Sequence, residues 1–165
     1  MKDAEVLARL LANLAETWQK YGRLLKEDLE INSYLEKHQK AFVRVQKIMQ
    51  KTGAALFCQE CGQAALSCCG KGMEFECEEA LLLANLVLGV KIPSSRHLAK
   101  GCFFLGPNGC VLKVRPLICR NFICPELKDA LGLSKIRQIQ DAFDEEAFYL
   151  FQLLERIKTI LTEQT

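Results

Sequence analysis

Apolar residues recur at helical spacing through the first fifty positions of the chain. They lie alternately four and three residues apart, which is typical of helices that pack on other helices, and the register changes near residue 29. The two runs are Leu7, Leu11, Leu14, Trp18, Tyr21 and Leu25, followed by Ile31, Leu35, His38, Phe42, Val45 and Met49. The pattern predicts a helical hairpin with its bend near residues 29–33, and one long kinked helix is the alternative. Ser33 and Glu36 fit an S-x-x-E capping box for the second helix.

The last thirty residues repeat this periodicity, with Ser134 as the expected N-cap of a long helix. Its predicted buried stripe comprises Ile136, Ile139, Phe143, Ala147, Leu150, Leu154, Ile157 and Leu161. The simplest assembly packs the terminal helices together as a bundle. The fold class is therefore mainly α, with the helical hairpin and the C-terminal helix packed around a loop-rich centre.

That centre, residues 53–125, shows less regular patterning. One short helix is expected over about 76–88, apolar on most sides and ended by Gly89 and then Pro93. The stretch "CFFLGPNGCVLKV" (102–114) predicts a small β-hairpin that turns at "GPNG". We expect a single domain over 1–165, divided into a helical arm (1–52), a cysteine-rich region (53–125) and a C-terminal helical arm (126–165).

Composition places the chain among ordinary globular domains. Half of its 165 residues are apolar, a quarter are charged, and the formal charge of +2 does not favour a nucleic-acid binder. The longest apolar run, "ALLLANLVLGV" (80–90), is shorter than the roughly 20 residues of a membrane span. The first residues, with Asp3, Glu5 and Glu16, do not resemble a signal peptide. We therefore expect a soluble, cytoplasmic protein.

Cysteine is the unusual component. All nine cysteines lie between residues 58 and 124. Cys77 begins an apolar helix and is interpreted as a packing residue. The other eight are candidate metal ligands: Cys58, Cys61, Cys68, Cys69, Cys102, Cys110, Cys119 and Cys124. In a reducing compartment, clustered cysteines are typically metal ligands or catalytic thiols. Eight thiols can form two four-thiolate sites, or one cluster with spare thiols.

Cys58 and Cys61 form a C-x-x-C pair followed by Gly62. Such a knuckle is typical of zinc ribbons and rubredoxin-type iron sites, because both thiolates can reach one ion. A redox pair is the alternative, but no βαβ pattern accompanies it. Cys68 and Cys69 are adjacent, so their side chains diverge. Either they serve two ions, or one binds metal while its neighbour packs.

Basic residues gather around the later cysteines. Between Ala80 and Pro125 there is no Asp or Glu, and the cations are Lys91, Arg96, Lys100, Lys113, Arg115 and Arg120. Cations would offset the net charge of about −2 that four thiolates leave around a divalent ion. An anionic ligand or nucleic acid is the less favoured explanation, because the patch is small and poor in aromatic residues.

The cysteine pattern resembles a known family. The run from Cys58 to Cys69 and the tail "CFFLGPNGCVLKVRPLICRNFIC" (102–124) resemble the YkgJ-like cysteine-cluster proteins, described as a zinc- or iron-chelating domain. About four extra residues between Gly62 and Cys68 depart from the family pattern. The resemblance implies metal binding through the eight matching cysteines. Flagellin lysine methylases are similar in carrying such a cluster, so an enzymatic role stays open.

Two functions follow from these observations. The first is a metal-binding protein that chelates zinc or iron through the eight cysteines, as a structural or partner-binding module. The second is an iron–sulfur redox protein or enzyme component, with Pro125 after Cys124 as in ferredoxins. Zinc hydrolysis needs an open coordination position and a base, for which Glu60 is the best-placed acid, and is disfavoured.

The two histidines and the helical arms complete the prediction. His97 is interpreted as a surface residue that could complete a metal site, and His38 as a packing or partner residue. The heptad-patterned helices allow a protein partner or a homodimer, and no membrane partner is expected.

Overall fold

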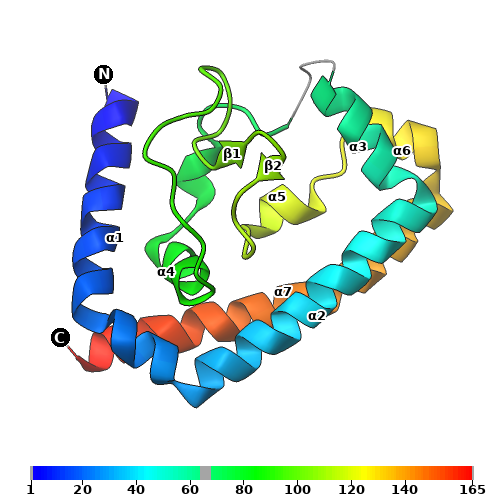
Figure 1. Ribbon diagram of the computed structural model, residues 1–165. Helices are drawn as coiled ribbons and strands as arrows, with labels where there is room; N and C mark the ends of the chain where they lie inside the picture. The colour runs from blue at the N-terminus through cyan, green and yellow to red at the C-terminus, as the bar shows by residue number, and fades with distance from the viewer. Residues whose placement is uncertain (1, 64–67, 165) are drawn as a thin grey trace.

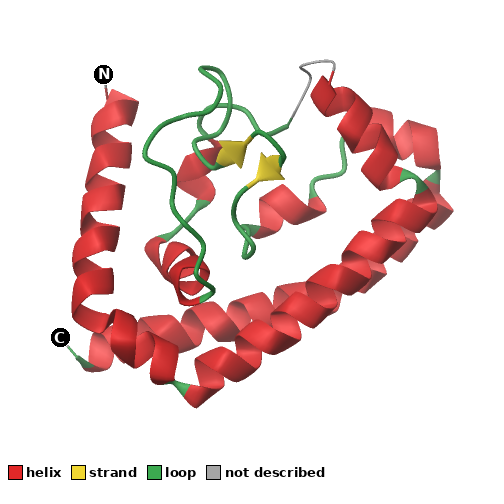
Figure 2. Ribbon diagram, in the orientation of Figure 1, coloured by secondary structure: helices red, strands yellow, loops and turns green. Residues whose placement is uncertain are grey.

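The computed structural model describes residues 2–63 and 68–164 of the chain. The three long helices α1, α2 and α7 form an open frame, and the loops, the hairpin and the short helix α4 lie inside it (Figures 1 and 2). In chain order the elements are α1 (Lys2–Glu27), α2 (Leu29–Thr52), α3 (Ala54–Gln63), the 3-10 turn η1 (Met73–Glu76), α4 (Glu79–Val87), β1 (Leu105–Gly106), β2 (Gly109–Cys110), α5 (Leu117–Asn121), α6 (Pro125–Leu131) and α7 (Leu133–Glu163). The prediction of a mainly α-helical fold with a small β-hairpin is confirmed.

The N-terminal helices separate at Asp28. Its backbone is extended, and its side-chain carboxylate accepts a 2.8 Å hydrogen bond from the backbone N–H of Ile31, as an N-cap does. The predicted capping box is therefore wrong, because Ser33 and Glu36 both lie inside α2. The predicted hairpin is wrong as well. The two helices diverge, and α2 lies along α7 instead of folding back on α1 (Figure 1).

The pairing of α2 with α7 buries the apolar stripes of both helices. The side chains buried along them are Ile31, Leu35, His38, Ala41 and Val45 of α2 with Ile136, Ile139, Phe143, Leu150, Leu153, Leu154, Ile157 and Ile160 of α7. The stripe predicted for α7 is largely confirmed, although Ala147 and Leu161 are only half-buried. Ser134 does not cap this helix. The helix begins at Leu133 after Gly132, whose φ of +76° favours glycine.

A buried ion pair attaches the centre of the molecule to this helix pair. The guanidinium of Arg120, on α5, donates to both carboxylate oxygens of Glu146, on α7, at 2.7 and 2.9 Å. The two side chains are 4% and 2% exposed. The guanidinium also lies 4.1 Å from the ring centroid of Phe42, on α2. One short helix is thereby held to both long ones.

The centre is built on α4, which is buried over Ala80–Asn85 and ends before Gly89, as predicted. The amide of Asn85 accepts from the backbone N–H groups of Lys113 and Val114 at 2.8 and 3.0 Å, and donates to the Val114 carbonyl at 2.8 Å. These bonds attach the segment after the hairpin to the buried helix.

The predicted β-hairpin is confirmed in a short form. Leu105 pairs with Cys110 and Gly106 with Gly109, with the expected turn between them. The expectation of a single helix within 53–125 is wrong, because α3 and α5 lie there too. None of the described helices is both long enough and apolar enough to cross a bilayer.

Replacement of Asp28 tests the junction between α1 and α2. Asp28→Ala removes the N-cap and a 2.6 Å ion pair with Arg156 of α7. We expect the free energy of unfolding to fall by about 1–2 kcal/mol, measured by urea denaturation followed by circular dichroism. Ser33→Ala, within the same helix, is the matched control and should change it by less than about 0.5 kcal/mol. Equal effects of the two substitutions would contradict this assignment.

Replacement of Glu146 tests the buried ion pair. Glu146→Gln leaves the Arg120 guanidinium buried without its counter-charge, so we expect a loss of about 3 kcal/mol in unfolding free energy. The control is Glu145→Gln, because Glu145 forms an exposed 2.5 Å pair with Arg44. That variant should lose less than about 1 kcal/mol. Similar losses for both, measured by the same denaturation, would show that burial does not set the strength of the inner pair.

Candidate metal centre

The eight candidate thiols come from separate segments of the chain. Cys58 and Cys61 both lie on α3, so the predicted glycine knuckle is wrong and Gly62 is also helical. Residues three apart on a helix still share one face. Cys58 and Cys61 therefore lie on one face of α3.

A short backbone pairing brings Cys69 beside Cys102. The carbonyl of Cys69 accepts from the N–H of Cys102 at 2.8 Å, and the N–H of Lys71 donates to the carbonyl of Lys100 at 2.9 Å. Gly70 and Gly101 form an isolated antiparallel bridge between these bonds. The hairpin that follows returns the chain to Cys110, on β2. Residues 64–67, which hold the departure from the family pattern, lie outside the described residues.

The last two cysteines belong to short helices. Cys119 lies on α5, and Cys124 is the N-cap of α6, where its sulfur accepts from the N–H of Leu127 at 3.3 Å. Pro125 occupies the first helical position, which suits a helix start. α6 packs against α3, and the charge of Cys124 acts on Cys58 of that helix.

The thiols nearest to α3 influence one another electrostatically. Burial raises the pKa of Cys58, and the charges of Cys124, Cys68, Cys61 and Cys69 raise it further. Burial also raises the pKa of Cys68, followed by the charges of Cys124, Cys69 and Cys61. A like charge raises a thiol pKa only when it is near. We call Cys58, Cys61, Cys68 and Cys124 the first quartet.

A second group surrounds the hairpin. Burial raises the pKa of Cys102 to about 11, and among the smaller contributions are the charges of Cys110 and Cys69. Burial likewise raises the pKa of Cys119 to about 11, with contributions from Cys69 and Cys110. We call Cys69, Cys102, Cys110 and Cys119 the second quartet. The charge of Cys69 also raises the pKa values of Cys58 and Cys68, so this residue lies between the two quartets.

The ninth cysteine lies beside the second quartet. Cys77 is 4% exposed and belongs to the apolar core. Burial raises its pKa strongly, and the charges of Cys102, Cys119 and Cys110 add to that effect. Its burial agrees with the interpretation of Cys77 as a packing residue.

The basic residues divide into different roles. Arg115 lowers the pKa values of Cys110 and Cys119, although burial raises both more strongly. It also donates to the backbone carbonyls of Leu112 and Cys110 at 2.8 and 3.4 Å. By contrast, Arg120 pairs with the buried carboxylate of Glu146. The sequence expectation that all six cations offset thiolate charge is therefore too broad.

One site residue was missed by the sequence analysis. Glu74, on η1, is fully buried and forms an ion pair with Arg96. Its other carboxylate oxygen accepts from the backbone N–H groups of Gly72 and Phe103, at 3.0 and 3.3 Å. Glu74 thereby joins the two segments that carry Cys69 and Cys102. Glu74 precedes the stretch between Ala80 and Pro125 that has no Asp or Glu, so the distribution of charge along the sequence did not point to it.

The donor set fits a soft metal ion chemically. Within the described residues, no three His, Cys, Asp or Glu side chains stand in an arrangement that already forms a metal site. The raised pKa values keep thiols protonated at neutral pH, and a bound cation would displace those protons and relieve the repulsion between thiolates. Thiolate donors select zinc or iron over magnesium or calcium. His97 and Glu60 are both exposed.

Comparison with known proteins gives no assignment. No family model, no curated protein and no solved structure matches the chain. The resemblance to the YkgJ-like cysteine-cluster proteins therefore stays a prediction that rests on the cysteine spacing.

Proposed function

We propose that this chain is a metal-binding protein that chelates zinc through its eight cysteines, as a structural or partner-binding module. The observation that supports it best is the mutual influence of these thiols, which come from six elements and loops. Their charges act on one another within each quartet, and Cys69 acts on thiols of both. Four thiolates per ion is the composition of a closed structural zinc site.

The centre contains little regular secondary structure, which supports a structural role for the metal. Its only sheet within the described residues is a pair of two-residue strands, and much of the rest is loop. A bound ion contributes its binding free energy to folding when its ligands come from several loops. Zinc would therefore stabilise a region that has few backbone pairings of its own.

An iron–sulfur redox protein or enzyme component is the second candidate. It is favoured by Cys124, which precedes Pro125 as the last cysteine of a ferredoxin run does, and by Arg115, whose charge acts on Cys110 and Cys119. Iron and acid-labile sulfide in a brown sample would select this candidate. Zinc in a colourless sample would select the structural module.

Metal content per chain, measured by elemental analysis on protein purified without oxygen, tests the proposal. We expect two ions in the unaltered chain. Replacement of one quartet's pair (Cys58→Ser with Cys61→Ser, or Cys110→Ser with Cys119→Ser) should reduce the content to one ion, because the other quartet keeps its four thiols. Cys77→Ser is the matched control and should retain both ions.

The same series distinguishes the alternatives. Loss of all metal from either double variant would indicate one shared cluster instead of two sites. Absence of metal from the unaltered chain, with the fold intact and the thiols free, would refute the proposed function. Equal loss from Cys77→Ser would move the ninth cysteine into the ligand set.

Removal of the metal should loosen the centre more than the frame. After treatment with a chelator, we expect faster amide hydrogen exchange over residues 69–124, measured by mass spectrometry. The α2–α7 pair should keep its protection, because its core consists of apolar side chains from the two helices. Uniform loss of protection, or none, would contradict a structural role confined to the centre.

A further inference from the structure

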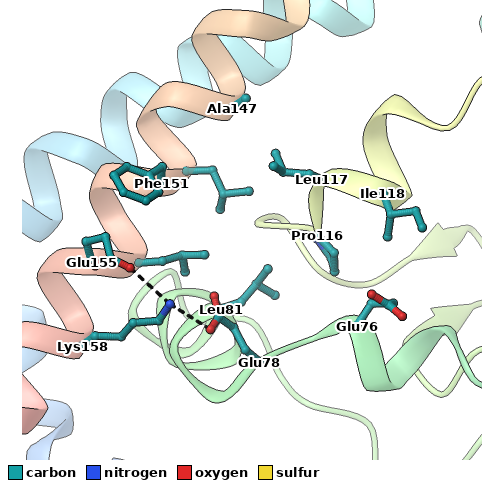
Figure 3. A pocket seen from close by; sticks show the side chains of 12 residues that line it. Glu76, Glu78, Leu81, Pro116, Leu117, Ile118, Ala147, Phe151, Glu155 and Lys158 are labelled. Carbon is teal, nitrogen blue, oxygen red and sulfur yellow. Dashed lines mark hydrogen bonds and ion pairs between the residues drawn. The ribbon is translucent and has the colours of Figure 1, made fainter.

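A groove of about 400 Å³ lies between α5 and α7, with η1 and α4 along its other side (Figure 3). Leu117 and Ile118 of α5 line it, each 47% exposed, opposite Phe151 of α7, which is 60% exposed. Leu150 and Leu154 are buried residues of the same lining. The volume falls within the range of natural ligand pockets.

The outer face of α7 beside the groove exposes large apolar side chains that do not contribute to the core. Phe148, three residues before Phe151 on the same helix face, is 56% exposed and extends the surface by one turn. Folded monomers rarely leave large apolar side chains grouped together on their surface unless something binds there. The inward stripe of α7 is already covered by α2, so this outward apolar group has no role in that pairing.

The rim of the groove is acidic. Glu76, Glu78 and Glu155 line it together with one cation, Lys158. Lys158 is shared between Glu78 and Glu155, at 3.0 and 3.3 Å, while Glu76 lies on the side of Pro116 and Ile118 (Figure 3). Three carboxylates and one ammonium leave a net charge of −2. Among the described residues, Glu76 forms no ion pair within 4.0 Å.

The negative charge of the rim indicates which kind of molecule can bind in the groove. A second copy bound about a twofold axis through the groove would bring two acidic rims together, since such an interface uses the same patch twice. A membrane surface rich in anionic lipid is repelled for the same reason. A peptide segment with an apolar face and basic side chains matches both the lining and the rim.

We infer that the groove between α5 and α7 docks an amphipathic, basic helix of a partner protein. The apolar side chains of that helix lie between Leu117 and Phe151, and a Lys or Arg of the helix pairs with Glu76. Such helix-in-groove recognition uses apolar anchors at helical spacing. The inference deepens the partner-binding part of the proposed function, and it does not require the metal itself to contact the partner.

A synthetic peptide provides the probe. It is a fluorescein-labelled helix of about 15 residues, long enough to form a helix on binding. Leu occupies the i, i+3, i+4 and i+7 positions, and Lys occupies the rest. Two matched peptides serve as controls, one with Glu in place of Lys and one with the Leu and Lys residues scrambled. By fluorescence polarisation, we expect saturable binding of the first and binding weaker by about tenfold or more for the others.

Variants of the chain locate the binding. Phe151→Ala and Glu76→Gln should each weaken binding about fivefold or more, because they remove an exposed anchor and an exposed rim charge. Leu133→Ala and Glu5→Gln are matched controls on exposed residues outside the groove, and should bind within about twofold of the unaltered chain. A higher salt concentration should weaken binding of the Lys peptide, because salt screens the exposed charges of the rim.

Each contrary result overturns the inference. It is refuted if the Lys peptide does not bind at up to about 1 mM, if the scrambled peptide binds equally, or if the groove variants bind as the controls do. Self-association in sedimentation that Phe151→Ala abolishes would assign the groove to a second copy instead. Metal content is measured on every sample. If the peptide binds to a chain that contains no metal, only the metal proposal is refuted. If the chain contains metal but does not bind the peptide, only the inference about the groove is refuted.

Discussion

The buried ion pair between Arg120 and Glu146 fixes α5, a helix of the cysteine-rich centre, against the pair of long helices. It connects α5, which carries Cys119, to the middle of α7, and the Phe42 ring of α2 covers the guanidinium. A charge pair in an apolar setting tolerates little displacement, because separating the charges leaves each uncompensated. One short helix is thus fixed against the frame, and the thiol beside Arg120 is fixed with it.

In our interpretation, the two sides of α5 have different functions. Cys119 belongs to the second quartet, while Leu117 and Ile118 line the apolar groove toward α7. A metal that orders the centre would therefore also order one wall of the groove. This arrangement gives a physical reason why a structural metal and a partner surface would occur in one small chain, since the helix that carries both is only five residues long.

Several features of the candidate site were accessible from sequence because they depend on local chemistry. The eight cysteines, the turn at "GPNG" and the end of α4 at Gly89 follow from residue type and spacing. Division of Cys68 and Cys69 between two ions was one of two open alternatives, and the electrostatics do not separate them, because the charge of Cys69 acts on Cys68 as well as on Cys102. The role of Glu74 was not accessible, because its partners Arg96 and Phe103 are more than twenty residues away in the chain.

The sequence by itself determined the long amphipathic helices, the acid-free basic stretch and the cluster of thiols, because periodicity and composition are local properties. Only the tertiary structure decided that α2 pairs with α7 and not with α1, and that Asp28 and not Ser33 begins α2. Apolar stripes specify that a helix packs but not against which partner. Asp28 was selected because its carboxylate serves both the Ile31 N–H and the distant Arg156. Such long-range pairings arise when the chain folds, and no local pattern encodes them.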